Sequence, residues 1–222
     1  MAISYKESSD VKPTGLPLST DLFSSLQKDI LQGKLKRGQK LTEQQICEEY
    51  MVSRTPVREA FKQLELVGLI ENIPNRGAFV VGLSPQDLDD LYEMRKSYEM
   101  LAVRWAIERI TKSEFEKLEE AFEFMEFYTQ KKDIEKMLNI NQSFHELIYN
   151  ASKNKMLAKI LSMFQMYIKQ SRSKRSYAED YLDVVLAEHR EIFQAFIDKD
   201  VEAGVAATAA HLENARLRAY NK

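Results

Sequence analysis

Residues 52–65 read VSRTPVREAFKQLE, which is the pattern of a short, capped helix with a basic beginning. Ser53 is a favourable N-cap residue, because its side-chain oxygen can accept a hydrogen bond from a backbone N–H of the first turn. Arg54 and Arg58 are four residues apart and share one face of the helix, whereas Val57 belongs to the apolar face. The stretch therefore predicts a helix that buries one side and presents two arginines near its N-terminus.

The segments on either side of this helix extend the pattern. Apolar residues at helical spacing predict a helix from about residue 19, and Thr42 is placed to cap a second helix. Beyond the quoted helix, residues 69–73 and 78–81 are β-prone and flank a turn cluster with Asn and Gly, which predicts a β-hairpin. Helix, turn, capped helix and hairpin in this order indicate a winged helix-turn-helix.

In a helix-turn-helix, the second helix of the pair enters the major groove of DNA, and its N-terminal residues meet the base edges. The guanidinium groups of Arg54 and Arg58 could each donate two hydrogen bonds to a guanine, and Thr55 could reach a phosphate or a base. Arg76 and Gly77 at the hairpin tip could place a cation in the minor groove or on the DNA backbone. Solvated surface charge is the alternative for the two helical arginines, but the order of elements favours DNA reading.

The same region resembles the GntR family of bacterial regulators over about residues 18–82. The resemblance rests on the quoted stretch, on Gly-Leu-Ile at 68–70 and on Asn-Arg-Gly-Ala-Phe-Val at 75–80. It implies a homodimer that binds a palindromic operator in double-stranded DNA. It also implies DNA contacts by six residues: Arg54, Thr55, Arg58, Arg76, Gly77 and Gln44.

The rest of the chain has the apolar spacing of long helices and lacks strand signals. We expect six helices, at 85–109, 112–130, 132–151, 154–172, 178–198 and 200–220. The predicted domains are a flexible tail at 1–17, a winged helix-turn-helix DNA-binding domain at 18–82, and a ligand-binding and dimerisation domain at 83–222. The expected fold class is mainly α, with the winged domain followed by an all-α helical-bundle sensor domain.

The three histidines of the chain all fall on predicted helices of the C-terminal part. Apolar residues stand three and four positions on either side of His189, so this residue is expected to point into the bundle. Three inward imidazoles from three helices could converge on one metal ion. The alternative is three unrelated histidines, each satisfied by a hydrogen bond within the core.

The C-terminal part resembles the FCD-type sensor domain of FadR-like GntR regulators, in its six-helix, VanR-like form. In metal-binding members, an Asp four residues before the first histidine joins three histidines as a ligand. His145, His189 and His211 match that pattern, but Asn141 stands in place of the Asp. Because an amide oxygen is a neutral ligand, Zn or Ni on the imidazoles is a better expectation than Mn or Mg.

A metal with open coordination positions would anchor a carboxylate, and the resemblance implies a small organic acid as the effector. Arg95 and Arg172 could point inward and pair with such an acid through charge-assisted hydrogen bonds. An ordinary surface salt bridge is the alternative for each arginine.

The composition limits the class of protein. Cys47 is the single cysteine, which excludes an intrachain disulfide and fits a reducing cytoplasm. The longest apolar run is far shorter than the roughly 20 residues that span a bilayer, so we expect a cytoplasmic protein without a membrane partner. The formal net charge of −2 argues against a sequence-tolerant nucleoid protein, because such binding depends on neutralising phosphates.

A metal-dependent hydrolase is the other hypothesis that three histidines allow. No general base is evident for it, because Glu146 and Glu188 neighbour histidines in sequence but are expected to point elsewhere on their helices. The winged domain would also have no role in such an enzyme. We therefore expect a ligand-responsive transcription regulator that acts as a repressor and is not an enzyme.

Overall fold

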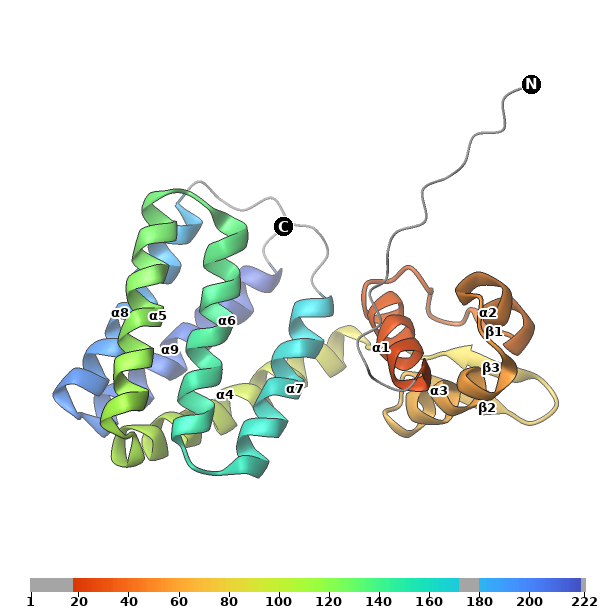
Figure 1. Ribbon diagram of the computed structural model, residues 1–222, viewed down its shortest axis with the longest axis horizontal. Helices are drawn as coiled ribbons and strands as arrows, with labels where there is room; N and C mark the ends of the chain where they lie inside the picture. Colours follow the sequence, from red (N-terminus) through yellow and green to blue (C-terminus); the bar gives the residue numbers. More distant parts are fainter. Residues whose placement is uncertain (1–17, 172–179, 221–222) are drawn as a thin grey trace, which may run out of the picture. The chain divides into compact units, whose positions relative to one another are not determined.

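The computed structural model describes residues 18–171 and 180–220, and it divides the chain into two compact units, Met1–Leu83 and Ser84–Lys222 (Figure 1). The predicted tail at 1–17 and the predicted effector contact Arg172 lie outside the described residues. The architecture is mainly α-helical with one small sheet, as the sequence predicts.

The first unit contains three helices and three strands among its described residues. In chain order these are α1 (Leu18–Leu31), β1 (Lys40–Leu41), α2 (Glu43–Tyr50), α3 (Arg54–Leu66), β2 (Ile70–Ile73) and β3 (Gly77–Val80). Its core is aliphatic, with Leu26, Ile46, Val57, Leu64 and Leu69 at most 2% exposed. Burial of the apolar faces of α1, α2 and α3 holds the helix-turn-helix against the sheet.

The helix starts in this unit are only partly as predicted. Thr42 caps α2 through a hydrogen bond of 3.2 Å from the backbone N–H of Gln45 to its side-chain oxygen. Ser53 is the N-cap of α3 by its extended backbone, but its side chain makes no capping hydrogen bond, so that part of the prediction is wrong. The exposed start of α3 therefore keeps backbone N–H groups that its N-cap side chain does not satisfy.

The sheet has the strand order β1-β3-β2, with both pairings antiparallel. The predicted hairpin is present, and β1 adds a short third strand by pairing Lys40 with Phe79. The turn depends on Asn75 and Gly77, whose φ angles are 61° and 99°. A Cβ on Gly77 would lie 3.2 Å from Cε of the flexible Lys40 side chain, which can move aside, so the positive φ is what favours glycine here.

Between Ser84 and Tyr220, the described residues form six helices, close to the predicted ranges. These are α4 (Pro85–Arg109), α5 (Lys112–Gln130), α6 (Ile134–Ala151), α7 (Lys155–Ser171), α8 (Tyr181–Asp198) and α9 (Val201–Tyr220). The predicted start of α6 at 132 is too early, because Lys132 has a φ of 54° and Asp133 caps the helix. None of the described helices has the length and apolar character needed to cross a membrane.

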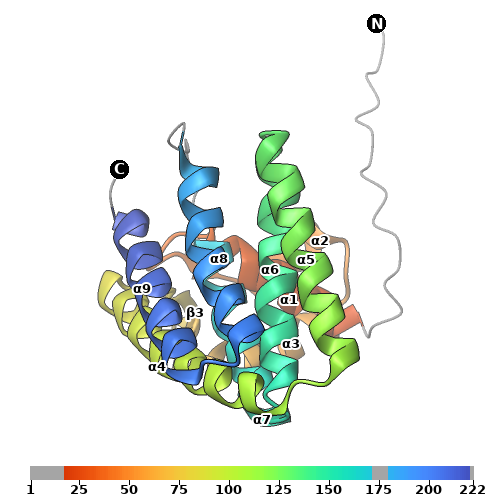
Figure 2. The ribbon, with the colours of Figure 1, turned by 90° about the vertical axis from the view of Figure 1, so that its left-hand side faces the viewer.

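The helices of this second unit form a bundle in which α4 packs against α6, α7 and α9. Figure 2 shows α5 beside α6 and α8 beside α9. Helix α9 packs tightly on α4 at Gly204, where a Cβ would lie only 2.5 Å from Cδ1 of Ile107. Further along α9, the guanidinium of Arg216 pairs with Asp89 in the second turn of α4 at 2.9 Å. Close packing at one end and ion pairing at the other join the two helices.

Candidate functional site

The chain's three histidines meet inside the second unit, each from a different helix. His145 lies on α6, His189 on α8 and His211 on α9, and their exposed fractions are 3%, 0% and 4%. One ring nitrogen of each histidine lies within 4.8 Å of those of the other two. The Nε2 atoms of His145 and His189 are 3.1 Å apart. The imidazoles therefore converge, as a shared metal site requires.

Two of these rings are held by carboxylates. The Nδ1 atom of His145 lies 3.1 Å from Oε2 of Glu99, and Nδ1 of His211 lies 2.8 Å from Oε2 of Glu188. A carboxylate accepts a hydrogen bond, so Nδ1 of each ring carries the proton and donates it. The Nε2 atom is then left with its lone pair, which is the form that binds a metal.

The third ring is held by the main chain. The Nδ1 atom of His189 lies 2.7 Å from the carbonyl oxygen of Val185, one turn earlier on α8. Since a carbonyl oxygen also accepts, this ring takes the same tautomer as the other two. Each imidazole is thus held through Nδ1, which leaves Nε2 as its second nitrogen. The Nε2 atoms of His145 and His189 face each other at 3.1 Å, a contact that a cation or a proton between them would stabilise.

Glu99 is the centre of a buried polar network on α4. It accepts hydrogen bonds from Nε of Arg95, at 2.6 Å, and from the hydroxyl of Tyr149. Burial alone would raise the pKa of Glu99, but the charge of Arg95 and the hydrogen bonds from His145 and Tyr149 outweigh it and hold that pKa below its usual range. Arg95, predicted as an effector contact, is 7% exposed and is committed to this carboxylate through Nε.

Glu188 of α8 holds His211 of α9, as Glu99 holds His145. Its two oxygens accept hydrogen bonds from the two terminal amino groups of Arg218, at 2.6 and 2.7 Å. Burial would raise the pKa of Glu188, but Arg218 and His211 lower it to about 2. The prediction that Glu188 points away from the histidines is therefore wrong. It turns away from His189, its neighbour in sequence, but α9 brings His211 to it.

Two of the histidines, His189 and His211, are held in the neutral form. Burial lowers the pKa of His189 well below its ordinary value, and the neighbouring His211 and His145 act in the same direction. Burial also lowers the pKa of His211 to about 4, although Glu188 opposes that shift. Neutral imidazole is the form that coordinates a metal, so the environment favours ligation over protonation at neutral pH.

Asn141 lies one helical turn before His145 on α6. Its Oδ1 atom is buried and has no hydrogen-bond partner among the described residues. A buried oxygen without a partner is unfavourable by roughly 1–3 kcal/mol, which a bound cation or a water would relieve. Three neutral imidazole nitrogens and one unpartnered amide oxygen are a donor set that fits a divalent transition metal.

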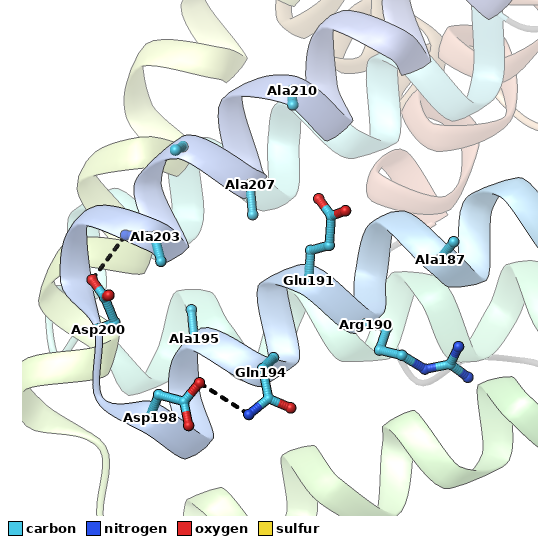
Figure 3. A pocket seen from close by; sticks show the side chains of 11 residues that line it. Ala187, Arg190, Glu191, Gln194, Ala195, Asp198, Asp200, Ala203, Ala207 and Ala210 are labelled. Carbon is cyan, nitrogen blue, oxygen red and sulfur yellow. Dashed lines mark hydrogen bonds between the residues drawn. The ribbon is translucent and has the colours of Figure 1, made fainter.

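The second unit also has an open groove of about 770 Å³ between α8 and α9 (Figure 3). Alanines of α9 such as Ala203 and Ala207 form one wall, and polar residues of α8 form the other. One of the acidic residues that line the groove, Asp198, accepts a hydrogen bond of 3.0 Å from the side chain of Gln194. None of the three histidines lines this groove, so the candidate site is the buried histidine cluster.

In the first unit, the predicted DNA contacts of α3 stand at its exposed start. Arg54, Thr55 and Arg58 are exposed, whereas Val57 is fully buried, as the helical spacing predicts. Nε of Arg58 donates a hydrogen bond of 2.7 Å to Oε1 of Glu43, the first residue of α2. Glu43 is not among the predicted site residues, although its place just after the predicted N-cap Thr42 was a signal that could have identified it.

The other predicted DNA contacts are exposed as well. Gln44 lies on α2, where its side chain donates to Glu48 at 3.0 Å. Arg76 and Gly77 lie at the turn between β2 and β3, and the guanidinium carbon of Arg76 is 5.7 Å from the ring centre of Phe79. The exposed positions of these residues leave them available to a ligand of the first unit.

Two known families match separate parts of the chain. Residues 18–80 match the family described as bacterial regulatory proteins, gntR family, and residues 90–214 match the FCD domain. The exposed arginines of α3 lie within the first match, and the three histidines lie within the second.

Full-length relatives agree with these matches. The HTH-type transcriptional regulator YdhC of Bacillus subtilis (strain 168) is 31% identical over 205 residues, which cover 91% of this chain and 90% of that protein. The galactonate operon transcriptional repressor of Escherichia coli (strain K12) is 27% identical over 216 residues, covering 87% and 93%. The solved structure of E. coli McbR/YncC has a TM-score of 0.67 and 24% identity over 92% of this chain and 98% of that one, which supports the fold.

The named relatives are transcription regulators, including a repressor, and not enzymes. The gntR family of bacterial regulatory proteins matches the winged unit, and the FCD domain matches the helical bundle that holds the histidine cluster. The chain therefore belongs to the GntR family of bacterial DNA-binding transcription regulators, with an FCD domain as its C-terminal part.

Proposed function

We propose that this protein is a repressor that binds a palindromic operator as a homodimer and responds to a small carboxylate effector beside a divalent metal ion. The observation that carries the proposal is the convergence of three imidazoles, each held through Nδ1 by an acceptor and each with one ring nitrogen within 4.8 Å of those of the other two. Structural hydrogen bonds alone would not require three buried histidines to converge in this way.

His145, His189, His211 and Asn141 would hold the ion. All four are neutral donors, and imidazole nitrogen suits Zn and Ni better than it suits Mn or Mg. A bound ion would supply a Lewis-acid anchor for an oxygen ligand. The residues of the chain supply the orientation, the exclusion of bulk water and the neutral ring form.

The charges near the cluster support an anionic effector. Arg95 is a buried cation near the cluster, where its charge contributes to lowering the pKa of His211, although its Nε already donates to Glu99. The relative named for the galactonate operon is consistent with a sugar acid or a similar carboxylate as the class of effector. Arg95 would contribute through groups other than Nε, and a role for Arg172 remains a prediction.

For DNA, we propose that Arg54, Thr55 and Arg58 read base edges and that Gln44, Arg76 and Gly77 support the complex. A two-fold operator needs two such heads in matched register, about one helical turn of DNA apart. An effector that binds one dimer geometry better than the other would shift the equilibrium by its difference in affinity, and so change operator binding.

The proposal is tested by the metal content of untagged protein purified without chelator, using plasma mass spectrometry. We expect about one Zn or Ni ion per chain, as in a site with a single ion. The variant His189→Ala should lose the metal while keeping its helical circular dichroism. A chain that stays metal-free even after dialysis against Zn and Ni would contradict the metal site.

The effector and the operator are tested with DNA selected from a random pool. Fluorescence anisotropy should show tighter binding to the selected duplex than to a scrambled duplex, and a panel of carboxylates should contain one that weakens this binding. Release by that carboxylate in wild type, but not in His189→Ala, would support a metal-anchored effector. Equal release in both would contradict it.

A further inference from the structure

Glu43 places a negative charge beside the two arginines that are expected to meet DNA. The carboxylate of Glu43 accepts a hydrogen bond of 2.7 Å from Nε of Arg58, which joins the first turn of α2 to α3. The side chains are 34% and 60% exposed, so the pair lies at the surface of the first unit. Among the described residues, Glu43 is the only hydrogen-bonding or ion-pair partner of Arg58.

A carboxylate in this position has an electrostatic cost when DNA approaches. The hydrogen bond from Arg58 lowers the pKa of Glu43, and the charges of Arg58 and Arg54 act in the same direction. Glu43 is therefore ionised at neutral pH, and its charge opposes the approach of phosphates, which supply much of the affinity for DNA. An acidic residue is expected on a DNA-reading surface only if it also has a favourable effect on DNA binding that offsets this repulsion.

The geometry of the Glu43–Arg58 pair indicates that this effect is the orientation of the guanidinium group. A guanidinium has two edges that can donate two parallel hydrogen bonds, and one of these includes Nε. With Nε bonded to Glu43, the terminal edge of Arg58 is the one left for O6 and N7 of a guanine. Holding a long side chain in place before binding also reduces the rotamer entropy that is lost in the complex.

We propose that Glu43 is a positioning residue for sequence reading, which holds Arg58 so that its terminal amino groups face a guanine of the operator. This inference rests on the proposed role of Arg58 in base contact. Two other roles are open to Glu43. It could accept a hydrogen bond from a cytosine amino group itself, or it could only repel the DNA backbone.

The test uses the full-length protein and duplexes selected from a random pool. Each G·C pair of the selected site is replaced singly by A·T, and affinities are measured by anisotropy at one fixed salt concentration. The variants are Glu43→Gln, Arg58→Ala and the two combined. Glu49→Gln is the matched control, because Glu49 is an exposed acid six residues further along α2 and is not the partner of Arg58.

We expect Arg58→Ala to reduce discrimination at one G·C pair by about 5- to 150-fold, the range for one bidentate contact. Glu43→Gln should reduce discrimination at the same pair by about three- to fivefold, in keeping with an exposed ion pair. It should have no further effect when Arg58 is already Ala. Glu49→Gln should leave discrimination unchanged, and thermal melting should show that all variants fold.

Four results would overturn the inference. An equal gain in affinity for every duplex in Glu43→Gln and Glu49→Gln would mean that Glu43 only repels DNA. A loss of discrimination by Glu43→Gln at another base pair, still seen with Arg58→Ala, would mean that Glu43 reads a base itself. A wild-type protein without sequence preference would reject both the proposed operator binding and this inference, whereas an intact preference that is insensitive to Arg58→Ala would reject the inference alone.

Discussion

His211 of α9 donates a hydrogen bond of 2.8 Å from Nδ1 to Glu188 of α8, and the same carboxylate holds both terminal amino groups of Arg218. The ring of His211 is thus fixed by a partner 23 residues earlier in the chain. This contact makes Glu188 part of the candidate metal site without being a ligand. Partners of this kind commonly change metal affinity when they are altered.

Glu188→Gln should weaken Zn or Ni binding by about 10- to 100-fold, because an amide holds the ring less firmly and lowers the basicity of Nε2. Competition with a coloured chelator would measure the affinity. Glu191→Gln is the matched control, since Glu191 is an exposed acid of α8 that lines the outer groove. Unchanged affinity in Glu188→Gln would remove Glu188 from the site.

Asn141→Asp should raise the affinity for divalent metals, with the largest gain for a hard ion such as Mn, because it adds a charged oxygen where Oδ1 of Asn141 is buried and unpartnered. Titration followed by electron paramagnetic resonance would measure Mn binding. Asn139→Asp adds the same charge at an exposed position of α6 and should change nothing. An equal response of the two variants would show that Asn141 does not face the metal.

Arg54→Ala should weaken binding to the selected operator by about 1–3 kcal/mol and relax the preference at one base pair. The comparison is Lys62→Ala, an exposed cation further along α3. That change should weaken binding to all sequences equally and reduce the slope of log affinity against log salt by about one, as expected for a phosphate contact. A uniform loss in Arg54→Ala as well would place Arg54 on the DNA backbone.

Metal-free protein should lose stability as the pH falls from about 7 to 5. Burial lowers the pKa of His211 to about 4 and that of His189 well below its ordinary value, so the unfolded chain binds protons first. Stability therefore falls as the pH drops through the unfolded value of about 6.5, by roughly 1 kcal/mol per histidine at pH 5.5. The carboxylate of Glu188, with a pKa of about 2, contributes only at lower pH.

Urea unfolding at pH 7.5 and 5.5, with a chelator present, would measure this difference. His211→Asn should reduce the pH dependence by about the share of one histidine. A wild-type stability that is flat across this range would contradict neutral, buried imidazoles.

The sequence predicted those features that depend on local spacing. The apolar face of α3, the six helices after Ser84 and the inward direction of His189 all follow from helical periodicity. The contacts that orient the histidines did not follow, because Glu99 and His145 are 46 residues apart and meet only when α4 packs on α6. Pairings of that kind depend on tertiary packing, which no local pattern carries.

Two local predictions, for Ser53 and for Glu188, were wrong. An N-cap serine has a favourable backbone in α3, yet Ser53 makes no capping bond there. Glu188 was judged by its position relative to His189 alone, whereas the neighbouring helix α9 supplies its partner. The hairpin prediction also did not include strand β1. Lys40 and Leu41 pair with the edge of β3 that the two-stranded hairpin leaves unpaired.

The tight contact at Gly204 has a mechanical consequence for α9. We expect a tilt of α9 relative to α4 to pivot about Gly204, where a Cβ would lie 2.5 Å from Cδ1 of Ile107 and 3.2 Å from Cγ1 of Val103. His211 lies seven residues away, about 10 Å along the helix, and Arg216 lies further out on the same lever. A small displacement of His211 would therefore be larger at Arg216, which is joined to Asp89 near the beginning of α4.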